Sequence, residues 1–175
     1  MKYQVFLKSM EYNNNKTSIR PMTVDDTPNV IRWRNAPFVM NNFLYREPLD
    51  EATHLNWIKE KIETGKVAQF IIYSKELGKD VGSVFLRDID QETKEAEYGI
   101  FIGEEDALGH GIGKEACETM VKYAKDALEL KRVFLRVFED NLPAIRSYEA
   151  AGFLRIPGSD VTHYSRNMIF MEIRF

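Results

Sequence analysis

The sequence predicts a mixed α/β fold, in which one sheet of parallel and antiparallel strands carries helices on both of its faces. Apolar periodicity gives the order strand, two helices, three strands, helix, strand, helix and final strands. A turn signal at 76–79 joins two strands directly, so these two run antiparallel. Strands separated by a helix need a crossover and can run parallel. The length of 175 residues suits a single domain.

Two helices are predicted in the N-terminal part of the chain. Thr23 is followed three residues later by Asp26, and this pairing can satisfy the free amides of a first helical turn. The helix that begins there is expected to run to about Asn35. A second helix is expected to begin at Asp50 and to end at Gly65. Its apolar face is expected to hold Leu55, Ile58 and Ile62.

The other elements follow from β-forming runs, turn residues and helical spacing. Strands are expected over 18–22, 67–73, 80–87, 95–102 and 132–138, with one or two more over 162–175, and helices over 111–128 and 142–151. Residues 1–16 are expected to form an N-terminal extension or an extra strand. The domain itself is then expected to span residues 17–175.

Composition and charge exclude several classes of protein. A net charge of −3 argues against a nucleic-acid partner, because phosphate binding needs a basic face. The single cysteine excludes an internal disulfide, and three scattered histidines match no metal-ligand spacing, so no metal is expected. No apolar run approaches the ~20 residues of a membrane helix. We therefore expect no membrane partner and a cytoplasmic location.

Alternating glycines occur in Leu108-Gly109-His110-Gly111-Ile112-Gly113-Lys114, just before the long predicted helix. Glycine allows backbone dihedrals that other residues avoid and lets a ligand approach the main chain. The start of the helix offers free amides and a partial positive charge, which suit a phosphate. The spacing matches neither a Walker A loop nor a dinucleotide fingerprint. The loop alone leaves open a pyrophosphate cradle and an ordinary turn that caps a helix.

The segment 137–153 carries a second pattern. Asn141 suits an N-cap, and Pro143 is tolerated in a first helical turn. Ala144 and Tyr148, three and seven residues further on, share a helix face with Asn141. The small Ala144 permits close approach to this face, and Tyr148 projects its hydroxyl from the same side.

With these two motifs, the sequence resembles the GNAT superfamily of acetyl-coenzyme A-dependent N-acetyltransferases. Segment 137–153 matches the family pattern Asn-x-x-Ala-x-x-x-Tyr-x-x-x-Gly-Phe, and the glycine loop about 30 residues earlier matches its Gly-x-Gly-x-Gly core. The family usually places Arg or Gln just before this core, where this chain has Leu108. The resemblance implies a strongly twisted mixed sheet of about seven strands with helices on both faces.

The resemblance also implies where acetyl-coenzyme A binds. Strand 95–102 would splay from strand 132–138 and admit the pantetheine arm, which would bond to main chain near Phe101 and Ile102. Asn141 would contact the pantetheine beside Ala144, and Tyr148 would lie near the thioester sulfur. The pyrophosphate would bind the amides of Gly109, Gly111, Ile112, Gly113 and Lys114.

Acetyl transfer to an amine needs a proton acceptor and a proton donor. Tyrosine has a pKa of about 10, so Tyr148 is protonated at neutral pH and can protonate the leaving thiolate. A core aromatic is the alternative interpretation of this residue. Glu97 lies on the strand that enters the splay, where similar enzymes often use a carboxylate as base. A solvated strand carboxylate is the alternative for Glu97.

The acceptor pocket of this superfamily is built largely from the first two helices. The triplet Trp33-Arg34-Asn35, followed by His54 in His-x-x-Trp-Ile, resembles the subgroup that acetylates nucleotide-linked amino sugars, including enzymes of pseudaminic acid synthesis. Arg34 or Arg32 would meet a diphosphate, and aromatic residues would stack on a base or sugar. Either tryptophan alone also suits a core anchor.

Other acceptors and another class of protein remain open. The sequence is similar, less closely, to acetyltransferases of ribosomal-protein N-termini and of spermidine, and Glu47, Asp50 and Glu51 offer carboxylates for a polyamine. A non-catalytic acyl-coenzyme A sensor would keep the cofactor site without turnover. The expected partner is a small-molecule amine, and the expected assembly is a monomer or a homodimer.

Overall fold

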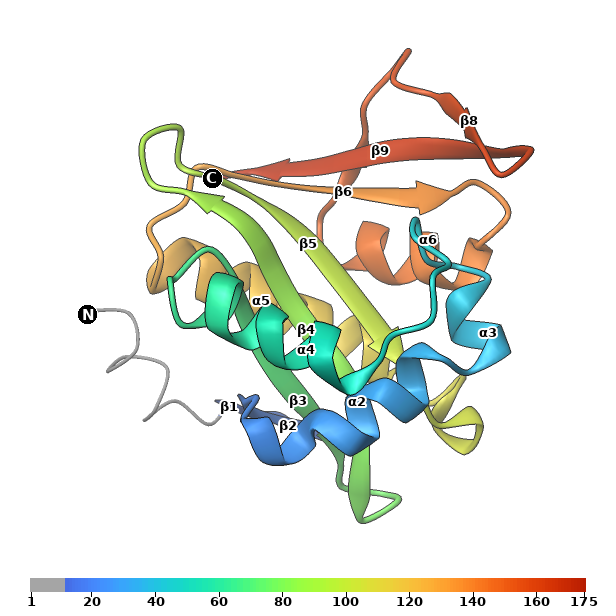
Figure 1. Cartoon of the computed structure of the whole chain (residues 1–175). Helices are drawn as coiled ribbons and strands as arrows, with labels where there is room; N and C mark the ends of the chain where they lie inside the picture. The colour runs from blue at the N-terminus through green and yellow to red at the C-terminus, as the bar shows by residue number, and fades with distance from the viewer. Residues whose placement is uncertain (1–11) are drawn as a thin grey trace.

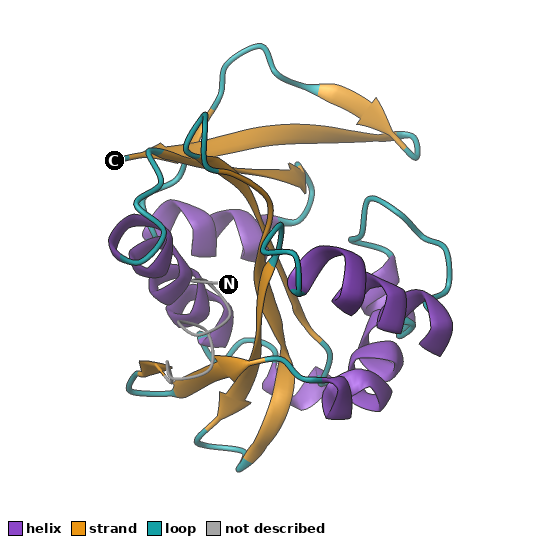
Figure 2. Cartoon of the chain, turned by 60° about the vertical axis from the view of Figure 1, so that its left-hand side comes forward, coloured by secondary structure: helices purple, strands orange, loops and turns teal. Residues whose placement is uncertain are grey.

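The computed structural model describes residues 12–175 and shows a mixed sheet with helices on both faces (Figures 1 and 2). The strands are β1 (Tyr12–Asn13), β2 (Thr17–Pro21), β3 (Ala68–Ser74), β4 (Lys79–Asp90), β5 (Glu95–Ile102), β6 (Arg132–Phe138), β7 (Leu154–Arg155), β8 (Val161–His163) and β9 (Arg166–Arg174). The α-helices are α2 (Thr27–Arg34), α3 (Pro37–Met40), α4 (Glu51–Trp57), α5 (Ile112–Asp126) and α6 (Leu142–Ala150).

The strands form one sheet in the order β1-β2-β3-β4-β5-β6-β9-β7, with β8 paired to β9. Within the described part of the chain, only β5 and β6 pair in parallel, so the predicted mixed sheet is confirmed. The sheet has nine strands rather than about seven, because β1, β7 and β8 are pieces of two or three residues. β1 pairs with β2 and so extends the sheet at its N-terminal edge; residues 1–11 lie outside the described residues.

The sheet separates two layers of helices, and each layer packs on one of its faces. Figure 2 shows the sheet nearly edge-on with helices to either side of it. One core, which includes Cys117 and Met120 of α5 and Tyr148 of α6, lies on one face of the sheet. A smaller core around Trp33 of α2, Ile58 and Phe101 lies on the other face. Residues of β5 therefore alternate between the two cores, with Phe101 on the α2 side and Tyr98 on the α5 side.

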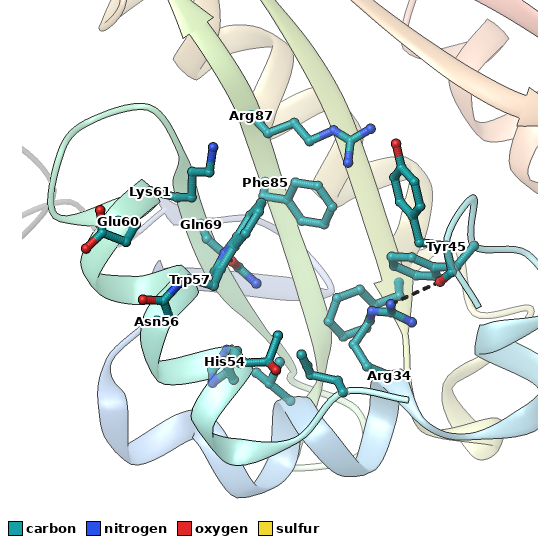
Figure 3. A pocket seen from close by; sticks show the side chains of 15 residues that line it. Arg34, Tyr45, His54, Asn56, Trp57, Glu60, Lys61, Gln69, Phe85 and Arg87 are labelled. Carbon is teal, nitrogen blue, oxygen red and sulfur yellow. Dashed lines mark hydrogen bonds between the residues drawn. The ribbon is translucent and has the colours of Figure 1, made fainter. Parts of the chain in front are cut away.

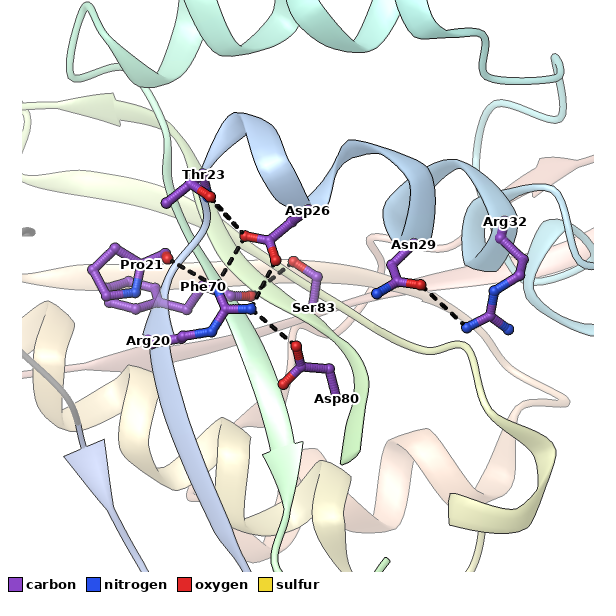
Figure 4. Close-up of polar contacts among 9 residues, drawn as sticks. All are labelled: Arg20, Pro21, Thr23, Asp26, Asn29, Arg32, Phe70, Asp80 and Ser83. Carbon is purple, nitrogen blue, oxygen red and sulfur yellow. Dashed lines mark hydrogen bonds and ion pairs between the residues drawn. The ribbon is translucent and has the colours of Figure 1, made fainter. Parts of the chain in front are cut away.

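An ion-pair cluster fixes the start of α2 to the sheet (Figure 4). Arg20 of β2 binds Asp26, with 2.7 Å between Nη2 and Oδ1, and Asp80 of β4 at 2.9 Å. Asp26 Oδ2 accepts the backbone N–H of Thr23 at 2.8 Å, as the predicted helix start requires. Burial acts to raise the pKa of Asp26, but Arg20 outweighs it and holds the pKa below its ordinary value. The cluster sets the direction in which α2 leaves the sheet.

The second predicted helix is present but turns a different face to the core. Asp50 caps it by accepting the Thr53 N–H, and a π-helical turn (Ile58–Ile62) continues it. Leu55, expected on the buried face, is 41% exposed, and His54 is buried in its place. Along residues 12–175, no helix is both long and apolar enough to cross a membrane.

Candidate functional site

β5 and β6 separate after a short stretch of pairing, as the resemblance implied (Figure 1). They pair only from Glu95 opposite Arg132 to Glu97 opposite Phe134, and β5 then runs on to Ile102 without this partner. The N–H of Gly103 donates to the Val81 carbonyl at 2.8 Å. Because main-chain groups alternate along a strand, those of Ile102 face the opposite edge, toward the splay. The splay thus has hydrogen-bonding main chain on its β5 side.

Phe101 contributes its side chain rather than its main chain. Its carbonyl oxygen lies toward β4, only 2.2 Å from where a Cβ on Gly82 would stand. Its ring lies on the other face of the sheet and lines a pocket there. Of the two residues predicted to bond the pantetheine arm, Ile102 therefore has the suitable main-chain orientation, whereas the Phe101 main chain faces β4.

The glycine loop has the geometry of a phosphate cradle. Gly109 and Gly111 have φ of +80° and +78°, a region that residues with a Cβ avoid. Gly111 is the N-cap of α5 and has no side chain that could cap the free amides, and its carbonyl accepts the Glu115 N–H at 3.2 Å. The amides before Glu115, which include those of Ile112 and Gly113, have no carbonyl within the helix to bond. The loop therefore fits the diphosphate of a coenzyme.

The start of α6 leaves a polar side chain free beside the splay. Asn141 is the N-cap of α6, but its side chain makes no capping hydrogen bond. Further along the same helix, Tyr148 is 9% exposed and packs edge-on against Tyr98, with 5.7 Å between ring centroids. Burial raises the pKa of Tyr148 well above that of a free phenol. Among the described residues, none bonds the Tyr148 hydroxyl, which leaves it available to a ligand.

Glu97 is held by two arginines. Its Oε2 accepts from Nε and Nη2 of Arg87 at 3.0 and 2.9 Å. Its Oε1 accepts from Nε of Arg136 at 2.7 Å, and Arg136 Nη2 reaches Oε2 at 3.0 Å. The carboxylate is only 5% exposed. Both oxygens of the predicted base are thus engaged in charge-assisted hydrogen bonds.

A pocket of about 300 Å³ lies between the sheet and the layer formed by α2, α4 and the loop 41–49 (Figure 3). Its walls are aromatic: Phe43, Tyr45, Trp57, Phe85 and Phe101. Its polar lining includes three cations and one carboxylate, namely Arg34, Lys61, Arg87 and Glu60. The sequence did not lead us to predict Phe85 or Arg87 as site residues. Both side chains project from the face of β4 that lies toward α2. Because side chains two residues apart on a strand share a face, this spacing was the sequence signal that could have identified them.

Arg34, predicted to contact the acceptor, lines this pocket without an acidic partner. Its guanidinium lies 3.5 Å from the centre of the Phe43 ring, and Nη2 donates to the Tyr45 carbonyl at 3.5 Å. Nη1 is buried and has no hydrogen-bond partner among residues 12–175. No carboxylate of residues 12–175 pairs with Arg34, and burial lowers the pKa of its guanidinium to about 10. The pocket therefore holds an uncompensated positive charge.

His54 is the second predicted acceptor residue that lines the pocket. It is 2% exposed, and its Nδ1 lies 3.0 Å from Thr27 Oγ1. Its Nε2 is buried and has no partner among the described residues. Burial lowers the pKa of His54, so the ring is neutral at pH 7. His54 therefore borders the pocket as a neutral ring.

Trp33 and Asn35 do not line the pocket. Trp33 is 1% exposed, and its Nε1 donates to Glu104 Oε1 at 2.7 Å. Asn35 bonds the main chain of Leu49 in both directions, at 2.8 Å each. These two predicted residues support the pocket wall instead of facing its interior.

The loop 41–49 is also fastened from the far end of the chain. His163, the last residue of β8, has its Nε2 2.7 Å from the Leu44 carbonyl. Arg166 donates to the Asn41 carbonyl at 2.6 Å and also binds Asp140, the residue before Asn141. One side chain therefore contacts both the pocket loop and the turn that begins α6.

Comparison with known proteins agrees with this geometry. Residues 16–154 match the family model of the acetyltransferase (GNAT) domain. The chain is 29% identical over 143 residues to the uncharacterized protein MJ1062 of Methanocaldococcus jannaschii; the match covers 80% of this chain and 28% of that protein. It is 25% identical over 124 residues to the acetyltransferase PseH of Campylobacter jejuni, which covers 71% of this chain and 74% of PseH.

A solved structure shares the fold. The spermidine N-acetyltransferase of Vibrio cholerae, in complex with CoA and spermine, matches with a TM-score of 0.82 at 19% identity, over 92% of this chain and 96% of that one. At this identity the likeness shows the fold. The splay, the glycine cradle and the match over residues 16–154 agree: the chain belongs to the GNAT family of N-acetyltransferases, and acetyl-coenzyme A is its acetyl donor.

Proposed function

We propose that the acceptor is a primary amine carried by a small anionic molecule, and that a nucleotide-linked amino sugar is the best candidate. The observation that supports this most directly is Arg34, a partly buried guanidinium that no carboxylate of the described chain neutralises. A buried charge without a partner is costly, and an anionic ligand removes that cost. A carboxylate or phosphate of the acceptor is the complementary group.

The remaining lining supports the same class of acceptor. Lys61 adds a second cation to Arg34, against the single carboxylate of Glu60, while the charge of Arg87 is already paired with Glu97. The aromatic walls suit the flat face of a sugar or base. About 300 Å³ is at the small end of ligand sites, so the pocket suits one ring of a larger acceptor.

The charge of the pocket opposes a polyamine acceptor. A polyamine would bring several positive charges against Arg34 and Lys61, and like charges at close range repel. Glu47, Asp50 and Glu51, the carboxylates that kept this alternative open, do not line the pocket.

In this proposal, one set of residues binds the acetyl donor and a separate set binds the acceptor. Acetyl-coenzyme A supplies a thioester carbonyl that an amine can attack. On the donor side, the amides that follow Gly111 hold the diphosphate, while Ile102 main chain and the Asn141 side chain orient the arm in the splay. The Tyr148 hydroxyl would donate a proton to the departing sulfur, and the attacking amine would pass its own proton to water. On the acceptor side, Arg34 orients the anionic acceptor.

The contacts of Glu97 support a positioning role. Because Arg87 and Arg136 occupy both oxygens, Glu97 holds Arg87 at the pocket wall. For Glu97→Gln we expect a rise in acceptor KM and a fall in Tm of about 5–10 °C, since breaking a buried ion pair costs about 3 kcal/mol. Steady-state kinetics and thermal unfolding measure both. If turnover instead falls about 100-fold while KM and Tm stay unchanged, Glu97 acts as the base.

Replacement of Arg34 tests the anion directly. For Arg34→Met we expect the KM of an anionic acceptor to rise about 10–100-fold, with a smaller change in kcat, because charge-assisted hydrogen bonds are worth about 1.5–3 kcal/mol. Arg32→Met is the matched control: Arg32 lies two residues away on α2, but it is exposed and pairs with Glu104. If both variants behave alike, Arg34 has no special role in recognition.

An acceptor screen tests the proposed function as a whole. Thiol release from acetyl-coenzyme A is followed with a UDP-4-amino sugar, a peptide with a free N-terminus, and spermidine. The proposal expects the amino sugar to give the highest kcat/KM. Faster turnover of spermidine would contradict it. Binding of the coenzyme without turnover of any amine would favour a sensor.

A further inference from the structure

Lys16 lies at the glycine cradle, although it belongs to the opposite end of the domain. It is in the turn between β1 and β2, before the predicted start of the domain. Its Nζ donates to the His110 carbonyl at 2.9 Å, inside the glycine loop. The same Nζ is the nearest atom to Gly111, 3.2 Å from where a Cβ of that residue would stand. An ammonium thus borders the main chain that is to hold a diphosphate.

The placement of Lys16 is enforced by the main chain around it. The Glu115 carboxylate, in the first turn of α5, accepts the N–H groups of Asn15, Lys16 and Thr17 at 3.1, 3.1 and 2.8 Å. It also accepts the Thr17 hydroxyl at 2.6 Å. One turn along α5, Thr119 accepts from Asn14 Nδ2 at 2.5 Å. The β1–β2 turn is therefore docked on the start of α5.

The charges at this point favour an anion. No carboxylate of residues 12–175 forms an ion pair with the Lys16 ammonium, because Glu115 is directed at the main chain of the turn. The free amides after Gly111 add the partial positive charge of the helix start. Leu108, which stands where the family usually has Arg or Gln, is 50% exposed and apolar. The loop itself thus lacks the expected side-chain contact.

We propose that Lys16 binds the diphosphate of coenzyme A and supplies the cationic contact that Leu108 cannot. Lys16 Nζ can keep its bond to the His110 carbonyl while it donates a second proton to a phosphate oxygen, because an ammonium has three donors. The contact comes from a neighbouring turn rather than from the glycine loop. This inference concerns the donor side and does not depend on which amine is the acceptor.

Calorimetric titration without an acceptor tests the proposal. For Lys16→Met we expect the Kd of coenzyme A to rise about tenfold, and that of 3′-dephospho-coenzyme A by the same factor. Pantetheine, which has no phosphate, should bind Lys16→Met and wild type equally. The dependence of affinity on salt should also become shallower. Lys16→Arg should keep most of the affinity, since it keeps the charge.

Lys122→Met is the matched control, because Lys122 lies on α5, the helix that begins at the cradle, but about 15 Å along it from the cradle. It should bind coenzyme A as wild type does. An unchanged Kd in Lys16→Met would overturn the proposal. So would a loss confined to coenzyme A and absent for the dephospho form, because the 3′-phosphate would then be the partner. Equal weakening of pantetheine would show a structural role and would also overturn it.

Discussion

Tyr148→Phe is expected to lower kcat by about 100-fold or more while the Kd of coenzyme A stays within about twofold, because the change removes only the proton that the leaving sulfur needs. Stability should hardly change, since no described residue bonds the hydroxyl that is lost. Steady-state kinetics and calorimetry on the same preparation measure the two effects.

A pH profile and a neighbouring tyrosine sharpen this test. Because burial raises the pKa of Tyr148, the phenol keeps its proton up to at least about pH 10, and its ionisation should cause no fall in turnover between about pH 7 and 10. Tyr98→Phe removes the same atom from the ring that packs against Tyr148 and is expected to stay active. Full activity of Tyr148→Phe would remove this residue from the mechanism.

Gly111→Val should abolish most of the affinity for acetyl-coenzyme A, with a rise in Kd of about tenfold or more. A β-branched residue at φ +78° is strained, and its side chain would cover the amides that follow. Its Cβ would also stand 3.2 Å from Lys16 Nζ. Calorimetry measures the loss.

Gly158→Val is the matched control for the strain. Gly158 has φ of +71° with open space around its Cβ position, and it lies outside the cradle. Gly158→Val should lower Tm by about as much as Gly111→Val does, without a loss of coenzyme affinity. If Gly111→Val folds and binds the coenzyme as tightly as wild type, the diphosphate does not lie on this loop.

The elements set by local signals were predictable from the sequence. Strands at 95–102 and 132–138 were predicted with the bounds that β5 and β6 have, because β-forming runs end at clear turn residues. Thr23 and Asp50 precede helical turns as predicted, a 3-10 turn at 24–26 in the first case and α4 in the second, since each start is set by a few adjacent residues. Both glycine-loop and α6 motifs were likewise local patterns.

Features that depend on packing between distant segments were not predictable. Leu55 is exposed because the helix continues as a π-helical turn, which breaks the 3.6-residue spacing on which the prediction rested. Trp33 and Arg34 are adjacent in sequence, yet the Trp33 side chain is buried in the core and the Arg34 side chain lines the pocket. Lys16 reaches the cradle through contacts with α5 nearly 100 positions away, for which a single sequence carries no local signal.

The attachment of the loop 41–49 to the last hairpin has a consequence for how such enzymes diversify. Arg166 joins that loop to the turn before Asn141, so we expect the C-terminal strands to influence acceptor choice although they contribute no wall of the cavity. Grafting another family member's hairpin, together with its loop, should therefore transfer selectivity between amines while the coenzyme cradle stays as it is.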